Sequence, residues 1–232
     1  LFIVANLLVL QEKLGYKFQD DSLLKLALTH PSASGKNSKP NEDNQRMEFL
    51  GDAILQVVIS DELYSLHINH NEGSLTKARA GLVNGTSLAK KAAPLGLENH
   101  LIIGGGQNAE FQRGKNSALE DAFEAITAAI YLDGGMESAR RFVQRIFAKE
   151  LKNPDQIAVI NNPKGELQEL LQSQSGETPK YDLLSSIGPD HNRKFQVVVQ
   201  HLGKELSKGT GSSKKEAESN AALAALRKIQ ES

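Results

Sequence analysis

The sequence predicts two domains of different class: an all-α N-terminal domain joined to a small α+β domain with the element order α-β-β-β-α. Apolar residues recur at helical spacing in successive segments between residues 7 and 151. A stretch typical of a linker follows at 153–162, with Asn153-Pro154 at its start and Asn162-Pro163 at its end. Beyond it, helical patterns at both ends enclose three short stretches of strand character. We therefore expect domains at 1–152 and 163–232.

Length and composition are consistent with this division. A chain of 232 residues is long enough for two ordinary domains, and 39% hydrophobic with 24% charged residues is typical of globular proteins. The net charge of -1 gives no overall basic field, so binding of nucleic acid would need a local basic patch. The absence of Cys excludes disulfides and thiolate metal sites and fits a reducing cytoplasm. The apolar start, Leu1–Leu10, is too short to span a bilayer and has no charged leader, so we expect a first helix and no membrane contact.

The N-terminal elements follow in order. More than one helix is expected within 7–30, and one helix at 44–67. A further helix is expected to begin at a cap, Ser74. The remaining helices are expected at 84–93, ending before Pro94, at 115–133, ending before Gly134 and Gly135, and at 136–151. A loop is expected at 33–43, which is rich in Ser, Gly, Lys, Asn and Pro. The glycines at 104–106 are expected to form an ordinary loop and not a phosphate-binding loop, because the Gly-Lys-Ser/Thr of such a loop is absent. His30 is a ligand, an acid-base group or a hydrogen-bonded structural residue beside Pro31, and the structural role is favoured.

The C-terminal elements are a helix, three strands and a helix. The helices are expected at 164–174 and 213–230, and the strands at Tyr181–Ser186, Phe195–His201 and Glu205–Lys208.

Two pairs of acids stand out within apolar helical segments. Glu48 and Asp52 are four residues apart, and Asp121 and Glu124 are three apart, so each pair shares one face of its helix. Burying ionised acids is costly unless a cation or hydrogen bonds compensate them. Such a pair is either exposed by the packing or held by a metal, and the presence of two pairs favours the metal. Carboxylates with no His or Cys in the motif suit Mg²⁺ or Mn²⁺, which promote phosphoryl chemistry.

A second candidate site is the start of the last helix. Lys214 and Lys215 lie at a helix N-terminus, where they oppose the helix dipole and where phosphate is favoured. The polar segment 188–194, between the first two strands, is either a nucleic-acid contact or an ordinary hairpin. Lys77 and Arg79 are either phosphate contacts or solvated surface charges.

Nearly the whole chain resembles bacterial ribonuclease III. Residues 44–55 are similar to the signature Asn-Glu-Arg-Leu-Glu-Phe-Leu-Gly-Asp-Ala-Val-Leu, residues 72–89 to its Glu-Gly-x-Leu-Thr segment, and residues 121–133 to its Asp-Ala-Phe-Glu-Ala helix with Tyr-Leu-Asp-Gly-Gly. Leu167-Gln168-Glu169, Gly188–His191 and Ser213–Glu218 resemble a double-stranded-RNA-binding domain.

The resemblance implies an all-α endonuclease domain that forms a homodimer, tethered to a domain that binds double-stranded RNA. It implies Mg²⁺, replaceable by Mn²⁺, held by Glu48, Asp52, Asp121 and Glu124, with Asp52 and Glu124 catalytic. Cleavage would leave a 5′-phosphate and a 3′-hydroxyl with short 3′ overhangs, in the processing of ribosomal RNA precursors and other structured transcripts in the cytoplasm. Phe49 matches a residue that packs into the partner subunit, although the residue pattern alone indicates only a core aromatic.

The same resemblance assigns the RNA contacts. Gln168, Gln172 and His191 match groups that reach the minor groove and its 2′-hydroxyls, and Lys214 and Lys215 match groups on the phosphates.

Gln45 departs from the family, which usually has Glu at this position. An amide cannot replace a charged ligand, so we expect no direct metal role for it. A non-catalytic RNA-binding relative remains the alternative, but it would be expected to lose some of the four acids.

Overall fold

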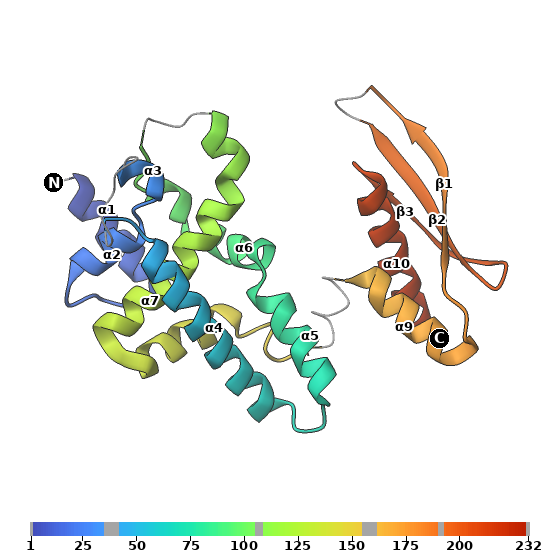
Figure 1. The fold of residues 1–232 in the computed structure, drawn as a ribbon, viewed down its shortest axis with the longest axis horizontal. Coiled ribbons are helices and arrows are strands. Elements are labelled where there is room, and N and C mark those ends of the chain that lie inside the picture. Colours follow the sequence, from blue (N-terminus) through green and yellow to red (C-terminus); the bar gives the residue numbers. More distant parts are fainter. Residues whose placement is uncertain (1, 35–41, 105–108, 155–161, 190–192, 231–232) are drawn as a thin grey trace. The chain divides into compact units, whose positions relative to one another are not determined.

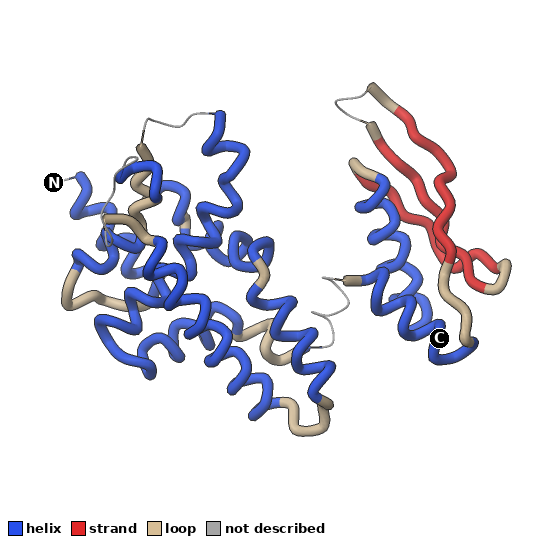
Figure 2. Tube along the Cα trace, in the orientation of Figure 1, coloured by secondary structure: helices blue, strands red, loops and turns tan. Residues whose placement is uncertain are grey.

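The computed structural model describes residues 2–34, 42–104, 109–154, 162–189 and 193–230. The chain divides into two compact units, Leu1–Pro154 and Asp155–Ser232. The first is helical and the second combines helices with a sheet (Figure 2), so the predicted fold class is confirmed. No helix in the described ranges has the length and apolar character needed to cross a membrane.

The first unit is built around the contact of two long helices, α4 and α7 (Figure 1). Its elements are α1 (Phe2–Leu14), α2 (Asp21–Ala27), α3 (Pro31–Ser34), α4 (Gln45–Leu66), α5 (Glu72–Val83), α6 (Gly85–Leu95), η1 (Leu97–Asn99) and α7 (Ala109–Phe147). The middle of α7 is buried on all sides, which explains its small and apolar residues. Fully buried there are Ala122, Phe123, Ala125, Ile126, Ala128, Ala129 and Ile130.

Glycine sets the distance between these two helices. A Cβ at Gly51 of α4 would overlap the carbonyl group of Glu124 on α7, so only glycine permits this approach. Because Gly51 lies between Glu48 and Asp52 and contacts Glu124, this close approach of the helices falls where both carry acids.

Several helix boundaries differ from the sequence predictions. Asn71, not Ser74, caps α5: its side chain accepts a hydrogen bond from the Ser74 N–H at 2.9 Å. Pro94 lies inside the last turn of α6, which ends at Leu95 and is capped by Gly96 with φ 73°. Helix α7 starts at Ala109 and changes direction at Gly135, where φ is 75°, so the helices expected at 115–133 and 136–151 are joined across a kink.

Asp133 fixes the chain at this kink. It accepts hydrogen bonds from the Tyr16 hydroxyl at 2.7 Å and from the backbone N–H groups of Gln19 and Asp20 at 2.9 and 3.0 Å. Burial opposes ionisation, but the hydrogen bonds outweigh it and lower the pKa of Asp133. The loop after α1 is thereby attached to the end of the segment of α7 that carries Asp121 and Glu124.

In the second unit, two helices cover one face of an antiparallel sheet of order β1-β2-β3 (Figure 1). The elements are α9 (Pro163–Ser175), β1 (Lys180–Ile187), β2 (Lys194–His201), β3 (Lys204–Gly211) and α10 (Lys214–Gln230). The core consists of Leu167, Leu171, Val199, Ala221, Ala222, Ala225 and Leu226. Strand β3 extends beyond the predicted end at Lys208, because Gly209 and Gly211 allow α10 to pack close to the strand.

Candidate functional site

The four acids predicted to bind metal come from the two helices that cross at Gly51. Glu48 and Asp52 lie one turn apart on α4, and Asp121 and Glu124 lie one turn apart on α7. The side chain of Glu124 is buried with 8% of its surface exposed, and the other three acids are half-buried. The helix crossing thus concentrates negative charge at one place in the first unit.

The pKa values show that these acids interact across the helix crossing. The pKa of Glu124 is raised to about 8 by burial and then by charged neighbours. In order of effect, these neighbours are Asp52, Glu120, Glu48 and Asp121. Burial and then the charge of Asp121 also raise the pKa of Glu48. Burial raises the pKa of Asp121, and His30 opposes this rise.

The side chains suit a divalent cation by their chemistry and charge. They offer hard carboxylate oxygens, and a cation would relieve the mutual repulsion that raises their pKa values. Within the described residues, no three Asp, Glu or His side chains are close enough to hold one ion in their present rotamers. Repulsion between the acids favours such separation, so an ion at this crossing would need the acid side chains to come closer together.

Two further side chains at this cluster were not predicted from the sequence. Glu120 precedes Asp121, and its pKa is raised by burial and then by the charges of Asp121 and Asp52. The sequence offered one indication of this position: Glu120 lies four residues before Glu124 and therefore on the same face of the helix. Gln56 lies four residues after Asp52 and donates hydrogen bonds to both of its carboxylate oxygens at 3.0 Å. Gln45 is exposed at the first residue of α4.

His30 and Arg79 have defined partners. His30 Nδ1 lies 2.8 Å from the Ser32 hydroxyl, so His30 is hydrogen-bonded as expected, but it also lies near Asp121. Arg79 donates to the Ser60 hydroxyl at 3.0 Å and so connects α5 to α4. Neither alternative considered for Arg79, a phosphate contact or a solvated charge, included this contact between helices.

Phe49 is a surface residue, contrary to the core position that its pattern indicated. Its side chain is 81% exposed, on the turn of α4 between Glu48 and Asp52. Next to it is a cavity of about 540 Å³ lined mainly by apolar side chains. The lining residues include Leu26, Met47, Phe49, Leu50 and the half-exposed Leu132. A large aromatic beside an apolar cavity is typical of a protein interface.

The described residues of the second candidate site are exposed. Gln168 and Gln172 lie four residues apart on α9, and Lys214 and Lys215 are the first residues of α10. His191, also predicted to contact RNA, lies outside the described residues.

The N-terminus of α10 is capped without these lysines. The Ser213 hydroxyl accepts from the Glu216 N–H at 3.1 Å, and the Glu216 carboxylate accepts from the Ser212 N–H at 2.7 Å. The lysines therefore project from a helix end that is already stabilised, and they are available to an anion.

Comparisons with known proteins match both units. The family model described as Ribonuclease-III-like matches residues 20–151, and that described as Double-stranded RNA binding motif matches residues 163–229. Ribonuclease 3 of Symbiobacterium thermophilum is 45% identical over 215 residues, which are 93% of this chain and 91% of that protein. Ribonuclease 3 of a Dehalococcoides mccartyi strain is 41% identical over 232 residues, covering 99% of this chain and 97% of that protein.

A solved structure supports the fold of the first unit. The nuclease domain of ribonuclease III from Campylobacter jejuni is 39% identical, with a TM-score of 0.56, and the match covers 61% of this chain and 96% of that one. That structure is described as showing flexibility in a region involved in dimer formation.

Proposed function

Because the chain belongs to the ribonuclease III family, we propose that it is a metal-dependent endonuclease that hydrolyses double-stranded RNA. The observation that carries this proposal is the meeting of acids from α4 and α7 at Gly51, where their charges raise one another's pKa values. A protein that only bound RNA would have no use for this costly arrangement. The match of residues 163–229 to a double-stranded-RNA-binding motif supports the choice of substrate.

The cation is proposed to be Mg²⁺, with Mn²⁺ as a substitute, held by Glu48, Asp52, Asp121 and Glu124. When bound, a divalent cation supplies Lewis-acid stabilisation of phosphoryl oxygens and makes water more acidic. Asp52 and Glu124 are the proposed catalytic pair, one from each helix. Without metal, burial and neighbouring acids raise the pKa of Glu124 to about 8, which favours its protonated form at neutral pH, and a bound cation would favour the ionised form. The products are expected to carry 5′-phosphates and 3′-hydroxyls.

The second unit is proposed to hold the duplex. Gln168 and Gln172 present amide groups on one face of α9, suited to the 2′-hydroxyls of the minor groove, and His191 is proposed to do the same. Lys214 and Lys215, at the start of α10, are suited to phosphates. Such contacts recognise shape and sugar and carry little base-sequence information.

The active form is proposed to be a homodimer in which Phe49 of each subunit inserts into the other. Its exposure and the adjacent apolar cavity support this assignment. Two acid clusters in one dimer would cut both strands and leave short 3′ overhangs. We place this activity in the cytoplasm, on ribosomal RNA precursors, messenger RNA precursors and other structured transcripts.

A cleavage assay tests the proposal. A long RNA duplex and a DNA duplex of the same sequence are incubated with the full chain, with and without Mg²⁺, and the ends of the products are determined. We expect cleavage of the RNA only, and only with Mg²⁺. The Glu124→Gln variant is expected to bind RNA and not cut it. Equal cleavage by this variant would contradict the role of Glu124, and equal cleavage of DNA would contradict the proposed substrate.

A further inference from the structure

The polar face of α4 continues beyond its two acids. Glu48, Asp52, Gln56 and Ser60 follow one another at intervals of four residues and are all half-buried, so they form one stripe along the helix. Within this stripe, Gln56 Nε2 lies 3.0 Å from both Oδ1 and Oδ2 of Asp52. A carboxylate only accepts hydrogen bonds, so the amide must present its NH₂ group to Asp52.

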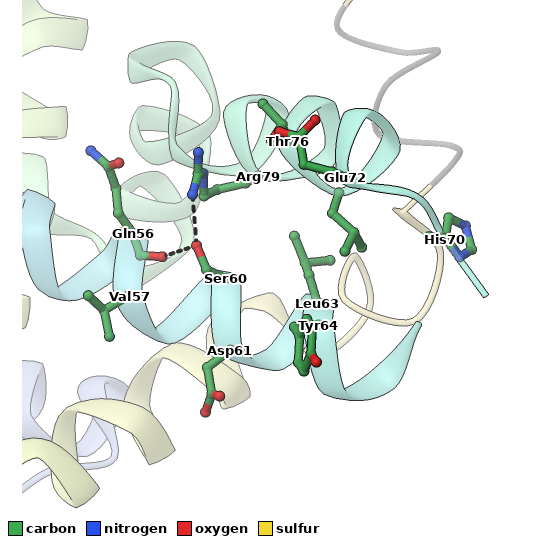
Figure 3. A pocket seen from close by; sticks show the side chains of 11 residues that line it. Gln56, Val57, Ser60, Asp61, Leu63, Tyr64, His70, Glu72, Thr76 and Arg79 are labelled. Carbon is green, nitrogen blue, oxygen red and sulfur yellow. Dashed lines mark hydrogen bonds between the residues drawn. The ribbon is translucent and has the colours of Figure 1, made fainter. Parts of the chain in front are cut away.

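The helix turn that carries Gln56 is attached to the neighbouring helix α5. The Ser60 hydroxyl donates to the backbone carbonyl of Gln56 at 2.6 Å, and Arg79 Nη1 of α5 donates to the Ser60 hydroxyl at 3.0 Å. Figure 3 shows these three residues together, with both hydrogen bonds dashed. They line a cavity of about 810 Å³ between α4 and α5.

The cavity shows that packing does not dictate the direction of the Gln56 side chain. A glutamine on its wall has room to turn its amide toward the cavity and water. It turns instead to Asp52, where its two contacts are charge-assisted hydrogen bonds. Three other groups at the helix crossing, Glu48, Glu120 and Glu124, are acids that repel Asp52.

We propose that Gln56 is a positioning residue that holds the carboxylate of Asp52 at the metal site. The proposal rests on the proposed function, because it assumes that Asp52 binds the catalytic cation. Without a donor, repulsion would spread Asp52 over several rotamers, and the cation would have to order it on binding. The amide of Gln56 restrains the carboxylate of Asp52 before a cation binds. Each carboxylate oxygen has two lone pairs, so it can keep this hydrogen bond while it also binds a cation. Gln56 thus lowers the concentration of cation needed to fill the site.

The test compares two substitutions of the same kind in the full chain. Gln56→Met keeps the length of the side chain and removes the donors. Gln144→Met is the matched control, because Gln144 also donates to a carboxylate, Glu62 at 3.0 Å, on the part of α7 beyond Gly135. Mn²⁺ is titrated into each protein without RNA, and free Mn²⁺ is followed by electron paramagnetic resonance. We expect Gln56→Met to weaken Mn²⁺ binding by about 10-fold or more, the usual effect of losing a group that orients a metal ligand, and Gln144→Met to bind like the parent.

A second measurement separates positioning from general damage to the fold. In an Asp52→Asn background, Gln56→Met is expected to cause no further loss of Mn²⁺ affinity, because its target is gone. In RNA cleavage, a high Mg²⁺ concentration is expected to restore the kcat of Gln56→Met to the parent value. A Mn²⁺ affinity of Gln56→Met within twofold of the parent would overturn the proposal. So would a loss of Mn²⁺ affinity on adding Gln56→Met to the Asp52→Asn protein that equals the loss caused by Gln56→Met in the parent. Failure of the parent to cut duplex RNA would instead contradict the proposed function.

Discussion

Replacing Gly51 by Ala tests the helix crossing that brings the four acids together. An added Cβ would overlap the carbonyl group of Glu124, which is backbone and cannot rotate away. Alanine gains about 1 kcal/mol in helix propensity over glycine, whereas inserting a methyl group into a closely packed contact costs about 1–3 kcal/mol. Because the obstacle is backbone, we expect the upper end of that cost and a net loss of about 1–2 kcal/mol.

The assay is thermal unfolding together with Mn²⁺ titration. For a unit of this size, each kcal/mol shifts Tm by about 2–4 °C, so we expect a decrease of about 2–8 °C. Mn²⁺ affinity is expected to fall as well, because the acids of α4 move away from those of α7. The control is Gly114→Ala on α7, where a Cβ meets no atom within 4 Å and helix propensity should raise stability. A Gly51→Ala protein as stable as Gly114→Ala, with unchanged Mn²⁺ affinity, would refute the reasoning.

Three further predictions concern charge and association. Burial and neighbouring acids raise the pKa of Glu124 from 4.5 to about 8, so the folded protein retains a proton that the unfolded chain releases above pH 4.5. The free energy of unfolding of the metal-free protein, measured with urea, should therefore fall as the pH rises from about 4.5 to 8, and it should fall less in Glu124→Gln. An identical pH dependence in both proteins would contradict the raised pKa of Glu124. Changing both Lys214 and Lys215 to Ala should weaken binding to RNA duplexes of any sequence and reduce the slope of log affinity against log salt by about 1–2. An unchanged slope would mean that these lysines contact only water. Phe49→Ala should shift a dimer toward monomer in sedimentation without lowering Tm of the monomer, since the side chain is 81% exposed; an unaltered dimer would remove Phe49 from the interface.

The features that the sequence predicts well depend on local periodicity. The spacing of apolar residues determines which segments are helices or strands, and the spacing of Glu48 and Asp52 determines that they share a helix face. Both relations hold within a single element, so they require no knowledge of its neighbours. For this reason the two-domain fold class was predictable.

The features that the sequence did not predict depend on contacts between elements. Phe49 has the spacing of a core residue, but which face of α4 is covered depends on α7, and this face is left open. The break at Gly134 and Gly135 was predicted, but the attachment of Asp133 to the loop after α1 was not, because it joins residues far apart in the sequence. Gln56 was not predicted, because a glutamine four residues from an acid is common and its hydrogen bond to Asp52 is apparent only in the structure.

The most direct test of the account is to locate Mn²⁺ in crystals of the protein by its anomalous scattering. We expect a peak at the crossing of α4 and α7, at bonding distance from carboxylate oxygens of Glu48, Asp52, Asp121 and Glu124. A peak elsewhere, or none at this crossing under conditions where the crystallised protein cuts RNA, would contradict it.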